Sequence, residues 1–264
     1  MLSYAFMQHA FIAGTAVALV AGAVGWVVVL RRSAFAAHAL SHIGFAGAAG
    51  ATALGVLPLW GLLVFCLGGA GFIGALGERA EDRDSAIGIV LAMALGLGVL
   101  FISLYAGSAS SAYAILFGEI LGVSQGDVLV TVAMAASCLI GLAVLWRPLL
   151  FASVDRSVAR ARGVAVSMIS VAFMLLLATT IAISVQVVGV LLIFALLVTP
   201  AAAAERLTAR PAAGVALSVA FALLAVEAGL CLGYYLGYPV SFWITSVATA
   251  TYVVARAVSS WRSR

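Results

Sequence analysis

Nine long apolar segments joined by short links make up most of this 264-residue sequence. Hydrophobic residues account for 66% of it and charged residues for 8%, whereas soluble domains carry about 25% charged residues. An apolar helix of about 20 residues spans a bilayer. The sequence therefore predicts an all-α, polytopic membrane protein with about nine (eight to nine) transmembrane helices and a single transmembrane domain over residues 1–264. The segments are residues 9–30, 35–55, 59–77, 86–106, 127–146, 164–184, 187–204, 212–236 and 239–256.

The positive charges predict an orientation in the membrane. All 13 of them are arginines, and when nine spans alternate in direction, every arginine falls on the same side. The positive-inside rule makes that side the cytoplasm, so we expect an outside N-terminus and a cytoplasmic C-terminus. The first 30 residues carry no charged side chain, which favours a first span over a cleavable signal peptide.

Several function classes do not fit this composition. The pI of 9.3 does not indicate nucleic-acid binding, because the arginines stand at the ends of apolar segments. No lysine is present, so a phosphate-binding loop that ends in GK[ST] is impossible. Neither HExxH nor GxSxG occurs. Energy from a nucleotide must therefore come from another polypeptide.

Two of the three histidines, His38 and His42, lie in the second apolar segment. Their spacing puts both imidazoles on one face of a helix. At about 1.5 Å per residue, His42 lies roughly 15 Å beyond Arg32, near the middle of a hydrocarbon core about 30 Å thick. Polar groups at this depth are costly unless they line a cavity or bind something. Because imidazole suits zinc and other borderline metals, the pair is a candidate metal pathway; histidines bonded to backbone or serine are the alternative.

Three carboxylates add weaker hypotheses. Glu227 lies inside the eighth segment, where a carboxylate needs a partner or a proton. It either assists the histidines or is held protonated against a neighbouring serine. Glu119 and Asp127 are expected near the outer surface, where they either attract cations into a mouth or are ordinary interfacial acids.

The longest cytoplasmic connection, residues 147–163, combines a cluster of arginines with helical periodicity. Val154, Val158, Ala161 and Val164 form one apolar side of a predicted short helix. A docking element for another protein and a solvated basic loop are both open.

Two other links have distinctive compositions. Residues 112–127 are too short and too interrupted to span a bilayer alone, so we predict a short interfacial or re-entrant helix there. Residues 78–84 mix acids with arginines and predict a solvated cytoplasmic loop.

Several segments carry distinctive motifs: GWVVVLRRSAF followed by HALSH, DSAIGIVLAMALGLGVL, LFGEILGVS, GLCLGYYLGYP, and VGVLLIFALLVTPAAAA at 188–204. Asp155, Ala159 and Gly163 are spaced as D…A…G. Together, these segments and this spacing resemble the membrane permeases of bacterial zinc and manganese ABC importers, and the resemblance covers most of the chain. The family patterns are RR and then GDxLxH, LFGdlL, D…A…G and VGxLLxxALLxxPAAxA, the last being the most specific match.

The resemblance implies a permease of the bacterial inner membrane that dimerises. It also implies docking of two cytoplasmic ATP-binding cassette subunits through residues 153–163, and metal delivery by an extracytoplasmic binding protein. The implied ATPase-coupling residues are Asp155, Arg156, Ala159, Arg160 and Gly163.

The family's pathway aspartate and histidine map to His38 and His42, so a histidine replaces the aspartate. This replacement shifts the expected preference from manganese towards zinc. Alternatively, His38 is not a ligand and the pathway relies on His42 with Glu227.

We therefore expect a permease that is not itself an enzyme and that moves a divalent transition metal, with zinc the first candidate, by alternating access. We expect no tightly bound cofactor, because Zn²⁺ or Mn²⁺ is the substrate. The alternatives are an ABC permease for manganese, iron or a metal chelate, a proton-coupled secondary carrier, and an intramembrane hydrolase.

Overall fold

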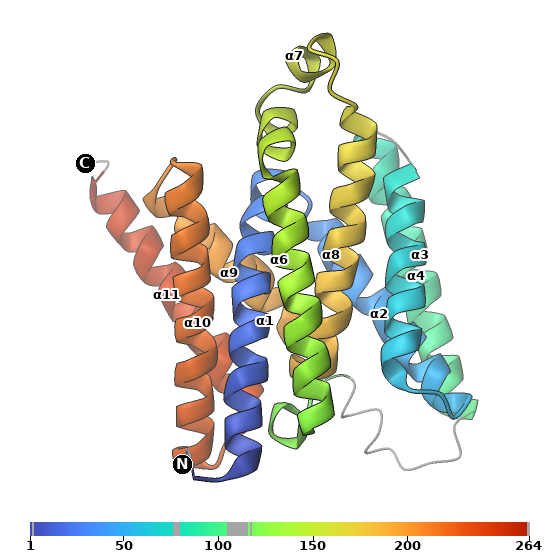
Figure 1. The fold of residues 1–264 in the computed structure, drawn as a ribbon, viewed down its shortest axis with the longest axis vertical. Coiled ribbons are helices and arrows are strands. Elements are labelled where there is room, and N and C mark those ends of the chain that lie inside the picture. The colour runs from blue at the N-terminus through green and yellow to red at the C-terminus, as the bar shows by residue number, and fades with distance from the viewer. Residues whose placement is uncertain (2, 76–79, 105–115, 117, 263–264) are drawn as a thin grey trace.

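The regular structure in the computed structural model is entirely helical over the residues that it describes, which are 1, 3–75, 80–104, 116 and 118–262 (Figure 1). The elements are α1 (Ala5–Leu30), α2 (Ala34–Ala53), α3 (Pro58–Ala75), α4 (Ala80–Leu104), the 3₁₀ turn η1 (Ile120–Gly122), α6 (Gln125–Val154), α7 (Arg156–Ala161), α8 (Val166–Val188), α9 (Val190–Leu207), α10 (Pro211–Leu236) and α11 (Val240–Arg262).

Each predicted apolar segment overlaps one long helix in this part of the chain. Six helical stretches are long and apolar enough to cross a membrane, which makes the protein multi-pass. They are Ala5–Leu30, Asp84–Leu104, Gln125–Val154, Val166–Val188, Val190–Leu207 and Pro211–Leu236. Membrane crossing by α2, α3 and α11, and with it the count of nine spans, stays a prediction.

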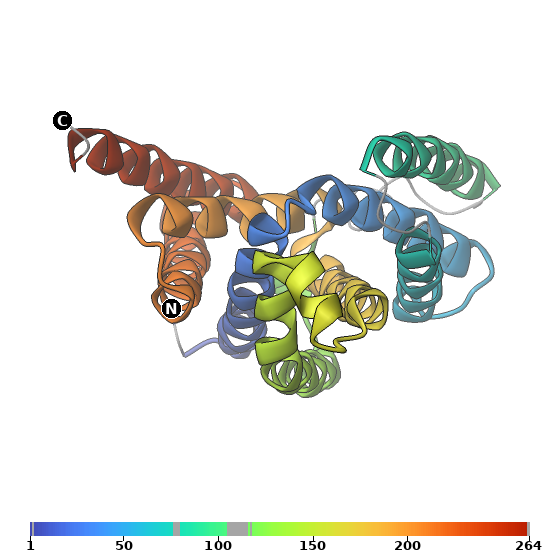
Figure 2. The same ribbon diagram turned by 90° about the horizontal axis from the view of Figure 1, so that it is seen from above.

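Helix α1 is the centre of the assembly. It packs against α6, α8, α9 and α10. In its most apolar stretch of 18 residues, 78% of the residues are buried inside the protein, compared with 17% in the corresponding stretch of α4. Seen from above, α2, α9 and α11 follow one another along one side of α1, while α10 and α6 flank α1 to its left and right (Figures 1 and 2). Helix α2 therefore lies in the interior, between α9 and the peripheral pair α3 and α4.

Glycines hold α2 tightly against α3. A Cβ added at Gly47 of α2 would meet the carbonyl oxygen of Gly61, and one added at Gly61 would meet the carbonyl oxygen of Gly47. In a bilayer, helices associate through such close backbone packing because lipid tails are as apolar as leucine. The small residues that dominate the sequence of α2 thus fix the position of the helix that carries the histidine pair.

Two helix boundaries differ from the sequence-based expectation. Helix α6 extends to Val154 and includes Arg147 and Pro148, which predict a helix end at 146. The burial of Leu149 and Ala152, each 1% exposed, holds the additional turns against the bundle. Helix α4 begins at Ala80, so most of the acidic stretch 78–84, predicted as a loop, is helical.

The predicted interfacial segment 112–127 lies partly outside the described residues. Of its described part, η1 forms one turn and α6 begins at Gln125.

Candidate functional site

The two histidines of α2 lie against each other. Their ring centroids are 4.7 Å apart, with the ring planes at 82°. The i, i+4 spacing predicts this contact, because both side chains leave the same face of the helix. Imidazole ligands of one tetrahedral ion, with metal–nitrogen bonds of about 2.0–2.1 Å, have centroids about 5 Å apart. The pair therefore has a spacing compatible with a shared ion.

The surroundings of the pair leave imidazole nitrogens unsatisfied. The Nδ1 atoms of both His38 and His42 are enclosed by protein and have no hydrogen-bond partner in it. Ser41, the adjacent serine, donates to the carbonyl oxygen of His38 at 2.7 Å and not to either ring. Unpaired buried polar atoms are uncommon in native proteins and call for a specific reason. A ligand for the imidazoles would supply that reason, whereas the alternative, a bond to backbone or serine, is not formed by either Nδ1 atom.

Helix α9 supplies an aromatic neighbour for this pair. The ring centroid of Phe194 lies 4.8 Å from that of His38, at an interplanar angle of 65°. Phe194 belongs to the segment 188–204, whose motif is the most specific in the sequence. The pair is thus placed where α2 meets α9. Among the described residues, no His, Cys, Asp or Glu joins it to make a cluster of three.

Glu227 has a different partner from those expected. The Oγ1 of Thr15 on α1 donates to its Oε1 at 2.6 Å, so the carboxyl group joins α1 to α10. A hydrogen bond from a hydroxyl group lowers the cost of a carboxyl group within a bilayer. The structure gives Glu227 no place in a metal-ligand cluster within the described chain.

The two outer acids occupy distinct settings. Asp127 forms the N-terminal capping box of α6 with Ser124, and its Oδ1 accepts a hydrogen bond of 3.0 Å from Nε2 of Gln186 on α8. Glu119 is exposed and lines a cavity of about 730 Å³ between η1 and the start of α11. Asp127 is therefore engaged in holding α6 against α8, whereas Glu119 faces an open cavity.

Helix α7 projects beyond the ends of its neighbours (Figure 1), and three residues explain its form. Asp155 is the N-cap: its Oδ1 accepts bonds from the hydroxyl of Ser157 at 2.6 Å and from the amides of Ser157 and Val158 at 2.9 and 3.0 Å. Gly163 follows the helix with φ +80°, a conformation that favours glycine. Ala159 is completely buried, in a small cluster with Ala152 of α6 and Val166 of α8. The D…A…G spacing is thus a cap, a packing contact and a turn.

Only Val158 and Ala161 of the expected apolar side lie in this helix, because Val154 ends α6 and Val164 follows the turn at Gly163. Val154 is 83% exposed and Val158 is 44% exposed, while Ala159 is the buried residue. The helix is too short to bury a valine face, and only the small Ala159 fits against Ala152 and Val166. The exposed Val158 beside the exposed Arg156 and Arg160 gives α7 a mixed apolar and basic surface.

The Ser157 hydroxyl lowers the pKa of the Asp155 carboxyl group, and the amides of Val158 and Ser157 lower it further. Hydrogen bonds to a carboxylate favour its charged form. Asp155 is therefore held ionised, and the negative charge sits at the N-terminus of α7, where the helix dipole also favours it.

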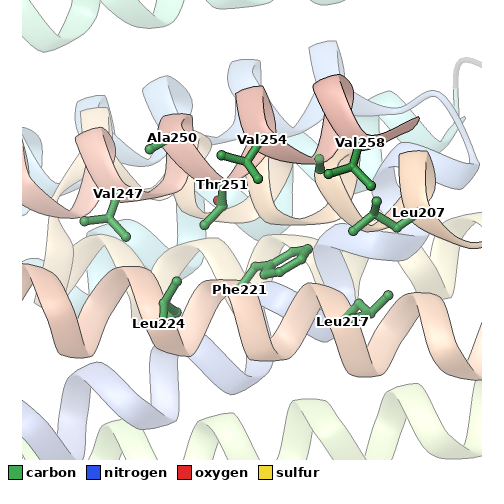
Figure 3. Close-up of a pocket in the computed structure, with 10 residues that line it drawn as sticks. Leu207, Leu217, Phe221, Leu224, Val247, Ala250, Thr251, Val254 and Val258 are labelled. Atoms are coloured by element: carbon green, nitrogen blue, oxygen red, sulfur yellow. The ribbon is translucent and has the colours of Figure 1, made fainter. Parts of the chain in front are cut away.

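A groove of about 610 Å³ between α10 and α11 has a different character (Figure 3). Its lining consists of aliphatic residues, Phe221 and Thr251. The hydroxyl of Thr251 donates to the carbonyl oxygen of Ala248. The groove therefore offers no charged ligand to a cation.

Sequence reasoning missed three side chains at these sites: Thr15 beside Glu227, Gln186 beside Asp127, and Phe194 beside His38. Thr15 and Phe194 belong to apolar segments, Gln186 lies between two of them, and each contacts a residue far away in the sequence. Only the motif that contains Phe194 carried a signal.

Comparisons with known proteins agree over nearly the whole chain. Residues 3–259 match the ABC 3 transport family. The manganese import system permease protein ScaB of Streptococcus parasanguinis is 34% identical over 95% of this chain and 89% of its own length. The manganese transport system membrane protein MntC of Halalkalibacterium halodurans is 33% identical over 87% of this chain and 79% of its own.

Solved structures show the same fold. PsaBC from Streptococcus pneumoniae, in complex with Fab, superposes with a TM-score of 0.85 at 32% identity, over 96% of this chain and 91% of that one. An inward-facing metal-chelate type ABC transporter reaches a TM-score of 0.69 at 19% identity, which shows likeness of fold. The chain therefore belongs to the ABC 3 transport family, the membrane permeases of bacterial metal ABC importers, and it is a multi-pass transport subunit of the plasma membrane and not an enzyme.

Proposed function

We propose that this chain carries a divalent transition metal into the cytoplasm along a route that includes His38 and His42. The observation that supports the route is the contact between the two imidazoles, 4.7 Å apart, with both Nδ1 atoms unpartnered inside the protein. Two ligands are fewer than the four of a structural zinc site. A pair completed by water suits a cargo that must leave again.

Membership of the family supports a direction of transport and an energy source. We propose that metal arrives from an extracytoplasmic binding protein at the outer face near Glu119 and Asp127, and that two ATP-binding cassette subunits dock on α7 of a permease homodimer. The exposed Val158, Arg156 and Arg160 of α7 support this docking, because a surface of that kind suits a partner with both apolar and acidic groups. ATP binding and hydrolysis in those subunits then alternate the access to the pathway through nine spans.

Zinc is the cargo that the ligand set favours. Imidazole nitrogens suit zinc, whereas oxygen donors suit manganese, and the described residues place no carboxylate in a cluster with the pair. Manganese is the second candidate, because the relatives ScaB and MntC are named for manganese transport. Family membership displaces the proton-coupled carrier and the intramembrane hydrolase.

The test is metal uptake into proteoliposomes that hold the permease with its ATPase subunits and binding protein. Zinc and manganese are supplied separately, with and without ATP. We expect ATP-dependent uptake that the substitution His42→Ala lowers at least about tenfold, because losing a metal-site partner typically costs that much.

His9→Ala is the matched control, because His9 lies at the beginning of α1 and outside the pair. Its uptake should equal that of the unmodified permease. Undiminished uptake by His42→Ala would remove the histidine pair from the route, and uptake without ATP would contradict the energy source.

A further inference from the structure

One arginine at the cytoplasmic end of α1 binds both helices that flank α7. Nη1 of Arg31 donates to the hydroxyl of Ser153 at 3.3 Å, and Nη2 donates to the hydroxyl of Ser170 at 2.8 Å. The guanidinium carbon lies 5.4 Å from the ring centroid of Phe173. We call Arg31, Ser153, Ser170 and Phe173 the Arg31 clamp.

The clamp brackets α7 in sequence and in space. Ser153 lies in the last turn of α6, just before the cap residue Asp155, and Ser170 and Phe173 lie in the first turns of α8. The Ser153 hydroxyl donates in turn to the carbonyl oxygen of Leu149 at 2.6 Å. The two supports of the projecting helix are therefore fastened to a single guanidinium group.

The charge of Arg31 does more than satisfy the positive-inside rule. Arg31 is partly buried, whereas the adjacent Arg32 is exposed. A guanidinium group holds its donors in a rigid planar fork and also stacks on aromatic rings, which a lysine ammonium cannot reproduce with the same geometry. The hydroxyls of Ser153 and Ser170 accept hydrogen bonds from the fork, and the ring of Phe173 lies beside the guanidinium group.

The same arginine is rigidly connected to the helix with the histidines. The amide of Arg32 bonds to the carbonyl oxygen of Val29 and that of Ser33 to the carbonyl oxygen of Val28, so the chain turns at once. Arg32 takes a φ of 53°, and α2 begins at Ala34, four residues before His38. Only two residues separate Arg31 from the start of α2. A displacement of Arg31 should therefore also displace the start of α2.

We propose that Arg31 is a positioning residue that transmits the movement of α7 to α2, and thereby couples ATP hydrolysis in the partner subunits to the accessibility of the histidine pair. This inference rests on the proposed function for its cargo. Its physical content is that α6, α8 and the start of α2 move as one unit because the clamp holds them. Arg31 itself touches no metal.

The test uses three clamp variants: Arg31→Gln, Arg31→Lys, and a double variant that combines Ser153→Ala and Ser170→Ala. The double variant keeps the charge of Arg31 but removes both hydroxyl acceptors. Arg147→Gln is the control, because Arg147 is an exposed arginine of α6 that takes no part in the clamp. Each permease is assembled with its ATPase subunits and binding protein in proteoliposomes. Both ATP hydrolysed and zinc or manganese taken up are measured.

We expect the three clamp variants to hydrolyse ATP at near the unmodified rate and to take up about fivefold less metal per ATP, a factor typical of lost coupling between sites. Arg147→Gln should keep the unmodified ratio. Clamp variants with an unchanged ratio, or with hydrolysis and uptake reduced in parallel, would overturn the proposal.

A second readout does not depend on the cargo. Hydrogen exchange is measured in α7 and α2 of the complex, with and without a non-hydrolysable ATP analogue. In the unmodified complex, the analogue should change exchange in both helices, and in Arg31→Gln it should change α7 alone. If the unmodified complex moves no metal but shows this pattern, the proposed cargo fails and the clamp stands. If Arg31→Gln retains the change in α2, the clamp fails whatever the cargo is.

Discussion

At the scale of single residues, we expect the side chain at position 38 to influence which ion the proposed route favours. The family pattern GDxLxH places a carboxylate where this chain has His38, and the structure brings that imidazole into contact with His42 and Phe194. An imidazole beside another imidazole and a phenyl ring is a poor environment for an ion that prefers oxygen ligands. Under the proposed function, we expect the identity of residue 38 to determine whether the permease prefers zinc or manganese.

We predict that His38→Asp shifts the preference of the permease from zinc towards manganese, by about tenfold in the ratio of the two uptake rates. The physical reason is that a carboxylate oxygen replaces one imidazole nitrogen while His42 stays in place. The measurement is competition between the two ions in one proteoliposome preparation. His38→Asn is the control, because it has a similar size to Asp without its charge. An unchanged ratio for His38→Asp would show that residue 38 is not a ligand.

At the scale of elements, α7 shows how a short helix is stabilised by specific contacts. It has six residues, far fewer than the 12–15 or so that an isolated helix needs in water. The Asp155 cap, the buried Ala159 and the turn at Gly163 supply what the helix lacks in length. Its stability therefore depends on a few specific contacts.

We predict that Asp155→Ala frays α7 and lowers metal uptake, because it removes the acceptor of two backbone amides. Asp155→Ser should retain much of both, since serine is also a favourable N-cap. Hydrogen exchange at Ser157 and Val158 measures the fraying directly. Equal exchange in Asp155→Ala and the unmodified chain would contradict the capping role.

The same cap has a predictable pH dependence. Because its hydrogen bonds lower the pKa of Asp155 in the folded chain, the unfolded segment binds the proton more tightly. The stabilisation is then complete above the ordinary carboxyl pKa and is lost as the pH falls through the lower, folded value. Asp155→Ser should lack this loss in acid.

The described elements also show what a sequence can and cannot predict. Apolar segments locate the helices, and i, i+4 spacing predicts that His38 meets His42, because both depend on local periodicity. The C-terminal extension of α6 past Pro148 was missed, because it depends on the burial of Leu149 and Ala152 against the bundle. The bonds of Thr15 to Glu227 and of Arg31 to Ser170 join residues far apart in the chain, and no local pattern encodes them.

At the scale of the whole molecule, α1 connects the sites. Thr15 of α1 binds the carboxyl group of Glu227, and the end of the same helix carries Arg31. Its core position between α6, α8, α9 and α10 makes α1 the element against which the others are arranged. In alternating access, one group of helices moves as a body relative to another, and the bonds of Arg31 place α1 in the same group as α6 and α8.

The arrangement of arginines gives the last prediction, which concerns the orientation of the chain. An odd number of spans puts the termini on opposite sides, and nine spans put all 13 arginines in the cytoplasm. Tyr4 is 53% exposed before α1, and Trp261 is 83% exposed near the end of α11. We therefore expect Tyr4→Cys to react with a membrane-impermeant maleimide in intact cells, and Trp261→Cys and Ser157→Cys to react only in inverted vesicles.

The unmodified chain is the control for this labelling, because Cys66 and Cys138 are buried and Cys231 is half-buried. Reaction of Tyr4→Cys and Trp261→Cys from the same side would mean an even number of spans. One of α2, α3 and α11, which are not among the six stretches long and apolar enough to cross a membrane, would then fail to cross. In that case Ser157→Cys decides which half of the chain is inverted: if it still reacts only in inverted vesicles, α7 keeps its cytoplasmic position and with it the place where the ATPase subunits are proposed to dock.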